Sequence, residues 1–236
     1  MIADIFDCHI HVEQGLHEYD LKISSGNVIF NFIDSYNKYA PLYPQFTHSL
    51  IFDYKNNFDF VANKIAEKSI AAIKVHSRIQ QITEEDYVTL IQHLKLAEVK
   101  CPVIYDAFYF GSELDFQPSL KGLVKLATEL PHLNFIVAHC GGHKVLEYFF
   151  HLRELKNIFF DLSFSLQYLN DTSCRMDLIK LIRYTDKQKI FFGSDYPFAN
   201  PTIQYNHLKT IFYEIKLGEM DQQKIVKDNF LQLINT

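Results

Sequence analysis

The sequence predicts an α/β fold, a distorted (β/α)8 TIM barrel with parallel strands inside and helices outside. Short apolar segments alternate with longer amphipathic ones, as in repeated strand–helix units. Several short segments, Phe135-Ile136-Val137-Ala138 among them, are continuously apolar, which is typical of parallel strands covered on both faces. No Pro-, Gly- or Ser-rich linker and no internal repeat interrupts the 236 residues, so we expect residues 1–236 to form a single domain.

Eight segments have the length and composition of strands, which is the number that a TIM barrel needs. They are residues 2–9, 28–33, 48–53, 71–76, 102–106, 134–139, 157–163 and 189–194. Residues 12–46 are the least regular part, and residues 28–33 fit a helix as well as a strand. A doubly wound sheet is the alternative architecture, but no Gly-rich phosphate-binding turn follows the first segment.

The segments between the strands carry apolar residues at helical spacing. Their ends carry helix signals: Thr83-Glu84-Glu85-Asp86 is a capping sequence, Ser119 precedes a second stripe, and Asn200-Pro201 places a cap before proline at the first helical position. The predicted apolar stripes lie within residues 87–97, 120–130, 146–150, 178–182, 208–215 and 225–233.

The composition excludes several classes of protein. With 48% hydrophobic residues and 22% charged residues, the chain is a globular protein rather than a disordered one. A net charge of −5 gives no reason to expect nucleic acid as a partner, and no apolar run reaches the roughly 18 residues of a membrane span. The N-terminal residues lack the basic start of a secretory signal, and the four cysteines lie far apart. We therefore expect reduced thiols and a cytoplasmic location.

Functional side chains of a barrel gather at the C-terminal ends of its strands. The first predicted strand ends in His9 and His11, which point the same way because they are two residues apart. His139 follows another strand, and Asp195 follows the last one. An ionised aspartate at the end of an apolar run is costly unless it is paired or bound to a metal. Three histidines and a carboxylate at one barrel mouth suit Zn²⁺ or a similar divalent ion.

These motifs together resemble the amidohydrolase superfamily, in particular its amidohydrolase-related branch of hydrolases and decarboxylases such as aminocarboxymuconate-semialdehyde decarboxylase. The residues that carry the resemblance run from the first strand to the last helix: Asp7-x-His9-x-His11, Ala138-His139-Cys140-Gly141-Gly142, Phe160-Asp161-Leu162-Ser163, Gly193-Ser194-Asp195-Tyr196-Pro197 and Lys227-Asp228-Asn229-Phe230. The resemblance implies a distorted TIM barrel with one divalent metal ion, Zn²⁺ in preference to Mn²⁺.

The resemblance also assigns roles. His9 and His11 match the first-strand metal ligands, and Asp195 matches a ligand that also transfers protons. His139 matches a histidine that binds metal or contacts substrate, so we assign catalysis to Asp195 and His139. At the fifth strand the branch usually has a ligand histidine, but here Asp106 stands in that place. Aspartate oxygen binds Zn²⁺, so Asp106 joins the predicted ligands; otherwise the site is weakened or lost.

The fourth strand adds Lys74 and His76 on one face, followed by Arg78. Other branches use a modified lysine at this place to bridge two metals, and we leave Lys74 out of the metal set. His76 and Arg78 are candidates for holding a substrate carboxylate, with a solvated loop arginine as the alternative. We assign Gly141-Gly142 to a tight turn. We assign Cys8 and Cys140 to packing in the protein interior rather than to the site.

We expect a metal-dependent hydrolase that acts on a small ester, lactone or amide, with a substrate that carries a carboxylate. A non-oxidative decarboxylase on the same scaffold needs the same ligands, and residue types do not separate the two. A third hypothesis, a barrel that has lost catalysis and only binds a ligand, rests on Asp106 and on the short chain. The sequence does not determine the oligomeric state, and a homodimer is one option.

Overall fold

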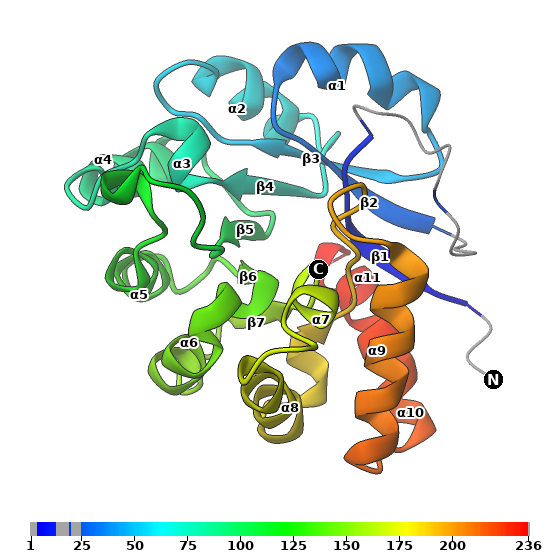
Figure 1. The fold of residues 1–236 in the computed structure, drawn as a ribbon. Coiled ribbons are helices and arrows are strands. Elements are labelled where there is room, and N and C mark those ends of the chain that lie inside the picture. Colours follow the sequence, from blue (N-terminus) through cyan, green and yellow to red (C-terminus); the bar gives the residue numbers. More distant parts are fainter. Residues whose placement is uncertain (1–3, 13–18, 20–24, 236) are drawn as a thin grey trace.

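The computed structural model describes residues 4–12, 19 and 25–235. Eight parallel strands run in chain order around a nearly closed barrel, and helices surround them (Figure 1), so the predicted (β/α)8 TIM barrel is confirmed. The strands are β1 (Phe6–Ile10), β2 (Ser25–Phe30), β3 (Thr47–Ile51), β4 (Ala72–Val75), β5 (Val103–Asp106), β6 (Phe135–Ala138), β7 (Ile158–Asp161) and β8 (Ile190–Phe191).

The outer layer consists of helices, with short helical turns between some of them. The α-helices are α1 (Ile33–Tyr39), α2 (Phe58–Ala66), α3 (Ser77–Gln80), α4 (Asp86–Leu96), α5 (Leu120–Glu129), α6 (Val145–Leu152), α7 (Ser165–Tyr168), α8 (Cys174–Tyr184), α9 (Pro201–Glu214), α10 (Glu219–Gln223) and α11 (Asn229–Ile234). The shorter turns are η1 (Ala40–Leu42), η2 (Leu114–Phe116), η3 (His139–Lys144), η4 (Lys187–Lys189) and the π-helical η5 (Lys224–Asp228).

Alternate residues of each strand face two different layers. On β5, Val103 and Tyr105 belong to the large cluster that packs against the helices, whereas Ile104 belongs to the small cluster inside the barrel. Because side chains alternate along a strand, Asp106 at the end of β5 faces inward with Ile104. The same alternation turns Lys74 of β4 inward. The polar residues at the strand ends therefore stand above an apolar barrel interior.

β1 departs from regular pairing in a way that helps to build the site. Asp7 pairs with Gly26, and Ile10 pairs with Val28. Between these two pairs β1 has one residue more than β2. Such a bulge redirects side chains. Cys8 faces the apolar interior while Ile10 faces the helices. His9 and His11 then both reach the mouth of the barrel.

The barrel closes between β1 and the segment after β8. The Cys8 backbone N–H donates to the Phe192 carbonyl at 3.0 Å, and the His11 N–H donates to the Tyr196 carbonyl at 2.7 Å. β8 is shorter than the predicted 189–194 because the Phe192 N–H donates to the Ile225 carbonyl of the C-terminal helical segment instead of a neighbouring strand. This arrangement carries Asp195 across to β1.

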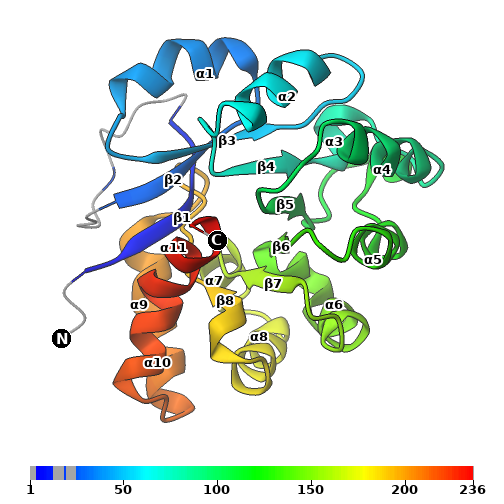
Figure 2. The same cartoon turned by 180° about the vertical axis from the view of Figure 1, so that it is seen from behind.

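The other end of the barrel is closed by the C-terminal helix. Phe230 and Leu233 of α11 pack into the interior cluster, and the Phe6 ring stacks on Phe230 at 5.3 Å. Figure 2 shows α11 against this end of the strands. Because α11 covers this end, the open end of the barrel is the opposite one, at the C-terminal ends of the strands.

Most local expectations hold. The segment that fitted helix or strand is a strand to Phe30, and α1 begins at Ile33 after an extended residue. Ser119 and Asn200 cap α5 and α9 as predicted, and each side chain accepts a hydrogen bond from the backbone N–H of the residue three positions later. No helix in the described part of the chain has the length and apolar character to cross a membrane. Part of residues 12–46, and the first residues of the segment 2–9, lie outside the described residues.

Candidate functional site

Two histidines and an aspartate meet at the open end of the barrel. His9 and His11 come from β1 and the residue just after it, and Asp195 follows β8 by four residues. Their ligand atoms all lie within 4.8 Å of one another. Nε2 of His9 lies 3.4 Å and Nε2 of His11 lies 3.6 Å from Oδ1 of Asp195. All three side chains are buried.

Each imidazole is held by its other nitrogen. Nδ1 of His9 lies 2.7 Å from Oδ2 of Asp161, and Nδ1 of His11 lies 2.8 Å from the Ile29 carbonyl. These acceptors place the proton on Nδ1 and leave Nε2 with a lone pair. Burial and the charge of Lys74 lower the pKa of both histidines, that of His11 strongly. Both rings are therefore neutral near pH 7, as metal ligation requires.

The geometry of this donor set fits a divalent ion. Zn²⁺ binds imidazole nitrogen and carboxylate oxygen at about 2.0–2.2 Å, usually with tetrahedral geometry, which separates ligand atoms by roughly 3.3–3.5 Å. The two distances to the Asp195 carboxylate, 3.4 and 3.6 Å, are close to that separation. The second nitrogen of each imidazole is bonded to an acceptor, which is the usual outer support of a metal-binding histidine.

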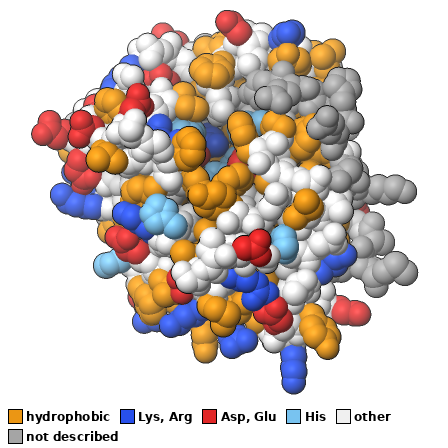
Figure 3. All heavy atoms as spheres, in the orientation of Figure 1, with side chains coloured by type: hydrophobic (Ala, Val, Ile, Leu, Met, Phe, Trp, Pro, Cys, Tyr) orange, Lys and Arg blue, Asp and Glu red, His pale blue; other side chains and the backbone are white. Residues whose placement is uncertain are grey.

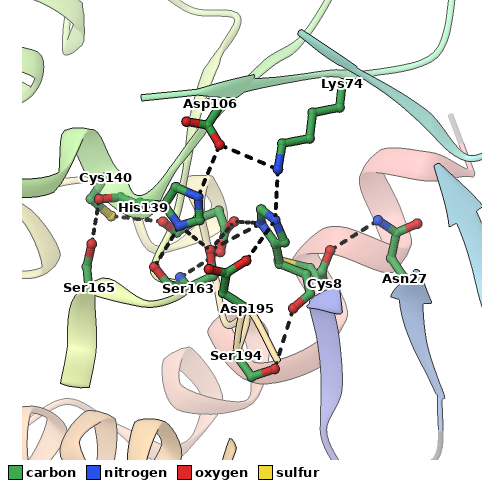
Figure 4. A network of polar contacts seen from close by, with 12 residues as sticks. Cys8, Asn27, Lys74, Asp106, His139, Cys140, Ser163, Ser165, Ser194 and Asp195 are labelled. Carbon is green, nitrogen blue, oxygen red and sulfur yellow. Dashed lines mark hydrogen bonds and ion pairs between the residues drawn. The ribbon is translucent and has the colours of Figure 1, made fainter. Parts of the chain in front are cut away.

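Lys74 projects from β4 into the same space (Figure 4). Its Nζ lies 3.3 Å from Nε2 of His9 and 3.5 Å from Oδ2 of Asp106. The ammonium group therefore donates to the lone pair that a metal ion would use. A cation at this position opposes metal binding unless a nearby carboxylate balances it.

Asp106 is surrounded by groups that carry or can carry positive charge. Its Oδ2 lies 3.5 Å from Nζ of Lys74, 3.5 Å from Nε2 of His76 and 3.4 Å from Nε2 of His139, and its Oδ1 lies 3.8 Å from Arg78. Burial favours the neutral acid, but these neighbours hold the pKa of Asp106 well below its usual value. Asp106 is thus an ionised, buried carboxylate, and it is not part of the three-residue set whose ligand atoms converge.

His139 is the cationic histidine of the site. Burial lowers its pKa, but the carboxylates of Asp195 and Asp106 outweigh burial and raise the value to about 8. Nε2 faces Asp106 at 3.4 Å, and Nδ1 lies 3.1 Å from the Ser163 carbonyl. Both nitrogens face acceptors, so the doubly protonated ring is favoured. For His76 burial prevails and lowers the pKa to about 4.

The backbone is strained where these residues stand. His139 has φ of 59° and Asp195 has φ of 64°, a region that non-glycine residues seldom adopt. Strained residues of this kind gather at functional sites. Gly193 permits the close approach of neighbouring groups, because a Cβ there would lie 2.7 Å from Oδ1 of Asp161 and 2.9 Å from the Cβ of His9.

A cleft of about 600 Å³ opens above these groups. Its lining combines charged and histidine side chains with aromatic ones: His11, Asn31, Lys74, His76, Arg78, Ile79, Asp106, Phe108, Phe110, His139, Phe164, Asp195 and Phe198. Figure 3 shows a hollow in which blue and pale-blue side chains lie within an orange, hydrophobic border. A larger hollow of about 1010 Å³ at the opposite end of the barrel contains none of these residues.

The structure brings the predicted site residues together. His11, His76, Arg78, Asp106, His139 and Asp195 all line the cleft, and His9 lies buried beneath it. Cys140 is buried with its Sγ 3.2 Å from the Asp161 carbonyl, in agreement with a packing role.

Two polar residues behind the ligands, Asp161 and Ser163, were not among the predicted site residues. Asp161 supports His9 from the end of β7, and Ser163 donates to Asp161 and contacts His139. Asp161 carries the same signal that selected Asp195, an acid after an apolar run. No comparable signal marks Ser163, because a serine after a strand is common.

Comparisons with solved structures reveal the same architecture. An inactive dihydroorotase-like domain from Chaetomium thermophilum has a TM-score of 0.71 and 12% identity over 98% of this chain and 79% of that chain. A 2,6-dihydroxybenzoate decarboxylase from Rhizobium has a TM-score of 0.65 and 14% identity over 98% of both chains. A manganese-bound 5-carboxyvanillate decarboxylase from Novosphingobium aromaticivorans has a TM-score of 0.64 and 10% identity over 91% and 78%.

At these identities the likeness establishes the fold alone. The search of curated proteins found no match to the sequence. The model of the amidohydrolase family, however, matches residues 84–233, which is more than half of the chain and includes Asp106, His139 and Asp195. The chain therefore belongs to the amidohydrolase family.

Proposed function

We propose that this protein is a divalent-metal-dependent hydrolase that acts on a small ester, lactone or amide bearing a carboxylate. The observation that carries the proposal is the convergence of His9, His11 and Asp195 at the floor of the cleft. Zn²⁺ suits the donor set best, and Mn²⁺ is the alternative because it accepts imidazole and carboxylate ligands. Asp106 stays a predicted fourth ligand. Its carboxylate lies 3.5 Å from Nζ of Lys74.

His9, His11 and Asp195 would hold the ion. When bound, the ion lowers the pKa of water and polarises a carbonyl group. Asp195 accepts a proton from the attacking water and passes it to the leaving group, as a positioned general base and acid. In the metal-free protein burial raises the pKa of Asp195.

His139 supplies positive charge where negative charge develops on the substrate oxygen. In the metal-free protein its pKa of about 8 favours the protonated ring near neutral pH. The Ser163 carbonyl, 3.1 Å from Nδ1, fixes the orientation of the ring. A preorganised positive charge of this kind stabilises an oxyanion without rearrangement during the reaction.

His76 and Arg78 would bind the substrate carboxylate. Arg78 has its guanidinium carbon 5.6 Å from the Phe110 ring centroid, so the aromatic face orients it at the cleft. His76 is neutral near pH 7, and because its Nδ1 accepts from the Ile79 N–H at 3.4 Å, its Nε2–H would donate the hydrogen bond beside Arg78.

The experiment is an activity screen of protein loaded with one equivalent of Zn²⁺ or Mn²⁺ against carboxylate-bearing lactones, esters and amides. We expect hydrolysis that disappears on chelation and returns with metal. The matched control is His9→Ala combined with His11→Ala, which removes two ligands while leaving the barrel interior untouched. Hydrolysis that survives in this double variant contradicts the proposal.

A second candidate is non-oxidative decarboxylation, favoured by the aromatic lining beside Arg78. Phe108, Phe110, Phe164 and Phe198 surround the mouth, a surface suited to a planar acid. The Rhizobium and Novosphingobium neighbours are named as decarboxylases of aromatic acids. In this reaction Arg78 would hold the carboxylate and His139 would protonate the carbon that loses CO₂. Release of CO₂ from hydroxybenzoates, without hydrolysis of any ester or lactone, would favour this reaction over hydrolysis.

Loss of catalysis is the remaining outcome. It rests on Asp106 in place of a ligand histidine, and the Chaetomium neighbour is itself an inactive domain. Protein purified without chelator that neither contains a divalent ion nor takes one up would favour a ligand-binding role.

A further inference from the structure

Two largely exposed phenylalanines stand at the mouth of the cleft, and we call them the rim. Phe110 is 66% exposed and Phe198 is 65% exposed, and both line the cleft. The Phe110 ring centroid lies 5.6 Å from the guanidinium carbon of Arg78, and the Phe198 ring lies 5.8 Å from the ring of His11. Single exposed apolar side chains are ordinary, but several around one cleft mark a binding surface (Figure 3). The rim therefore adjoins the polar site directly.

A continuous series of rings leads from the floor of the cleft toward the surface. The Phe108 ring centroid lies 5.9 Å from that of His139 and 5.2 Å from that of Tyr168, a residue that is 53% exposed. Phe164 lies 5.0 Å from both Phe108 and Tyr168. We call Phe108, Phe164 and Tyr168 the aromatic wall. An apolar group attached to a carbonyl held at His139 would meet this wall at once.

The backbone holds two rings of the wall against the cleft. Phe164 has φ of 61°, a region that non-glycine residues seldom adopt. Beneath the Phe108 ring lies Gly142, where a Cβ would come within 2.8 Å of Cδ2 of Phe108. Strained backbone of the kind found at Phe164 gathers at functional sites. The wall is therefore positioned by the fold.

The cleft is larger than a small ester or lactone requires. Its volume of about 600 Å³ corresponds to about twenty non-hydrogen atoms, if each takes the roughly 30 Å³ of a water molecule. Clefts of this size commonly hold drug-sized ligands. A carboxylate-bearing ester of about ten such atoms would fill the floor and leave about half of the space, beside the wall and the rim, to water.

The angles between the rings favour a saturated chain over a flat ring system in this outer space. Phe108 meets Phe164 at 85° and Tyr168 at 81°. Phe164 and Tyr168 stack on each other at 5.0 Å, which leaves no room for a third ring between them. A flat ligand is held best between two parallel ring faces, and these three rings offer no such slot. Burial of CH₂ groups is non-directional and has no such requirement.

We propose that the aromatic wall and the rim bind a saturated acyl chain of about six to ten carbons, the length that the outer half of the cleft accommodates. The substrate is then an acyl ester or acyl amide whose other half carries the carboxylate. The inference rests on the proposed function for the hydrolysed bond and for the carboxylate contact of Arg78. Addition of water across the acyl bond releases a fatty acid and the alcohol or amine that bears the carboxylate.

The test measures binding of unbranched alkanoates from butanoate to decanoate, which have a carboxylate and a chain but no bond to hydrolyse. Each is titrated calorimetrically into the Zn²⁺-loaded protein, into the double variant Phe110→Ser with Phe198→Ser, and into Tyr168→Ser. Phe150→Ser is the matched control, because Phe150 is an exposed phenylalanine of α6 that lines a different hollow. A naphthoate and ω-hydroxyoctanoate complete the set of probes.

We expect the affinity to rise about threefold with each added CH₂ group, so that octanoate binds about a hundredfold more tightly than butanoate. The rim and wall variants each weaken octanoate binding about tenfold and leave butanoate binding within about twofold. Phe150→Ser changes neither. Decanoate binds more tightly than the naphthoate, which has a similar number of carbons. ω-Hydroxyoctanoate binds more weakly than octanoate, because its hydroxyl group would lie against apolar rings.

The possible results separate this inference from the proposed function. Equal affinities of butanoate and octanoate, a chain-length gain that survives in both the rim and the wall variants, or tighter binding of the naphthoate than of decanoate would overturn the acyl site, even in an active hydrolase. So would a dimer in sedimentation experiments that the rim variant dissociates, because a second copy would then cover the rim. Failure of every alkanoate to bind would overturn the inference as well. A chain-length gain in a protein that hydrolyses no ester or amide would support the acyl site and overturn the proposed function.

Discussion

Nδ1 of His9 lies 2.7 Å from Oδ2 of Asp161, the last residue of β7. Asp161 also accepts from the Ser163 N–H at 2.8 Å and from the Ser163 hydroxyl at 2.6 Å. Burial alone would raise the pKa of Asp161, but His9 and these hydrogen bonds keep it below its usual value. The ionised carboxylate thereby fixes one tautomer of His9, with Nε2 open toward Asp195.

Replacing Asp161 should therefore weaken metal binding without removing a ligand. We expect Asp161→Asn to lower the affinity for Zn²⁺ by about 10- to 100-fold, the usual effect of losing a partner of a ligand histidine. Competition with a chromophoric chelator measures the affinity. Asp171→Asn, a change at an exposed acid, is the control and should have no effect. An unchanged affinity in Asp161→Asn would mean that His9 does not need this partner to hold the ion.

Replacing Asp106 should also weaken metal binding. Asp106→Ala removes an oxygen donor and leaves the charge of Lys74, 3.3 Å from Nε2 of His9, without its balancing carboxylate. We expect a loss of affinity of about tenfold or more. Asp106→His should keep the metal and, by removing a negative charge beside it, move the alkaline-rising limb of the pH–rate profile to lower pH. An Asp106→Ala protein with the parent affinity would exclude Asp106 from the ligands.

Replacing Lys74 should have the opposite effect. Lys74→Met preserves much of the side-chain volume but removes the cation that donates to His9. We expect the affinity for Zn²⁺ to rise by about tenfold. Lys74→Arg, which keeps the charge, is the matched control. A loss of affinity in Lys74→Met would show that the lysine supports the ion instead of opposing it.

Protonation of His139 should be visible in metal-free protein. Its pKa is about 8 in the folded protein and about 6.5 in an unfolded chain, so folding favours the protonated ring. The resulting stability is fully present below pH 6.5 and is lost as the pH rises to about 8. The difference corresponds to about 2 kcal/mol. In urea unfolding of chelator-treated protein, the stability of the parent relative to His139→Gln should fall by about 2 kcal/mol between pH 6 and pH 9, because the other buried histidines contribute equally to both proteins. Equal pH dependence in both proteins would place the ring's pKa elsewhere.

The close packing behind the ligands should make Gly193 intolerant of a side chain. A Cβ at this position would lie 2.7 Å from Oδ1 of Asp161, 2.9 Å from Cβ of His9 and 3.0 Å from Cβ of Ser163. We expect Gly193→Ala to displace His9 and to reduce metal affinity at least tenfold. Gly218→Ala, where a Cβ meets nothing within 4 Å, is the control. Metal binding that is unimpaired in Gly193→Ala would mean that the surrounding side chains can shift.

The sequence by itself determined the succession of strands and helices. Continuous apolar segments and helical stripes are local patterns, and so are the caps at Ser119 and Asn200. The spacing of His9 and His11 and the acid at Asp195 also follow from local position, because a strand end fixes where a side chain stands. These features suffice for a TIM barrel with a polar mouth.

Only the tertiary structure decided how those groups pair. The sequence does not indicate that the extra residue in β1 turns His9 toward Asp161 of β7, 152 positions away. Nor does it indicate that Asp106 meets Lys74 and His139. Such pairings depend on the closure of the barrel, which brings together strand ends that are distant in the chain. Charge balance and hydrogen bonding at the site are therefore properties of the closed barrel rather than of any segment.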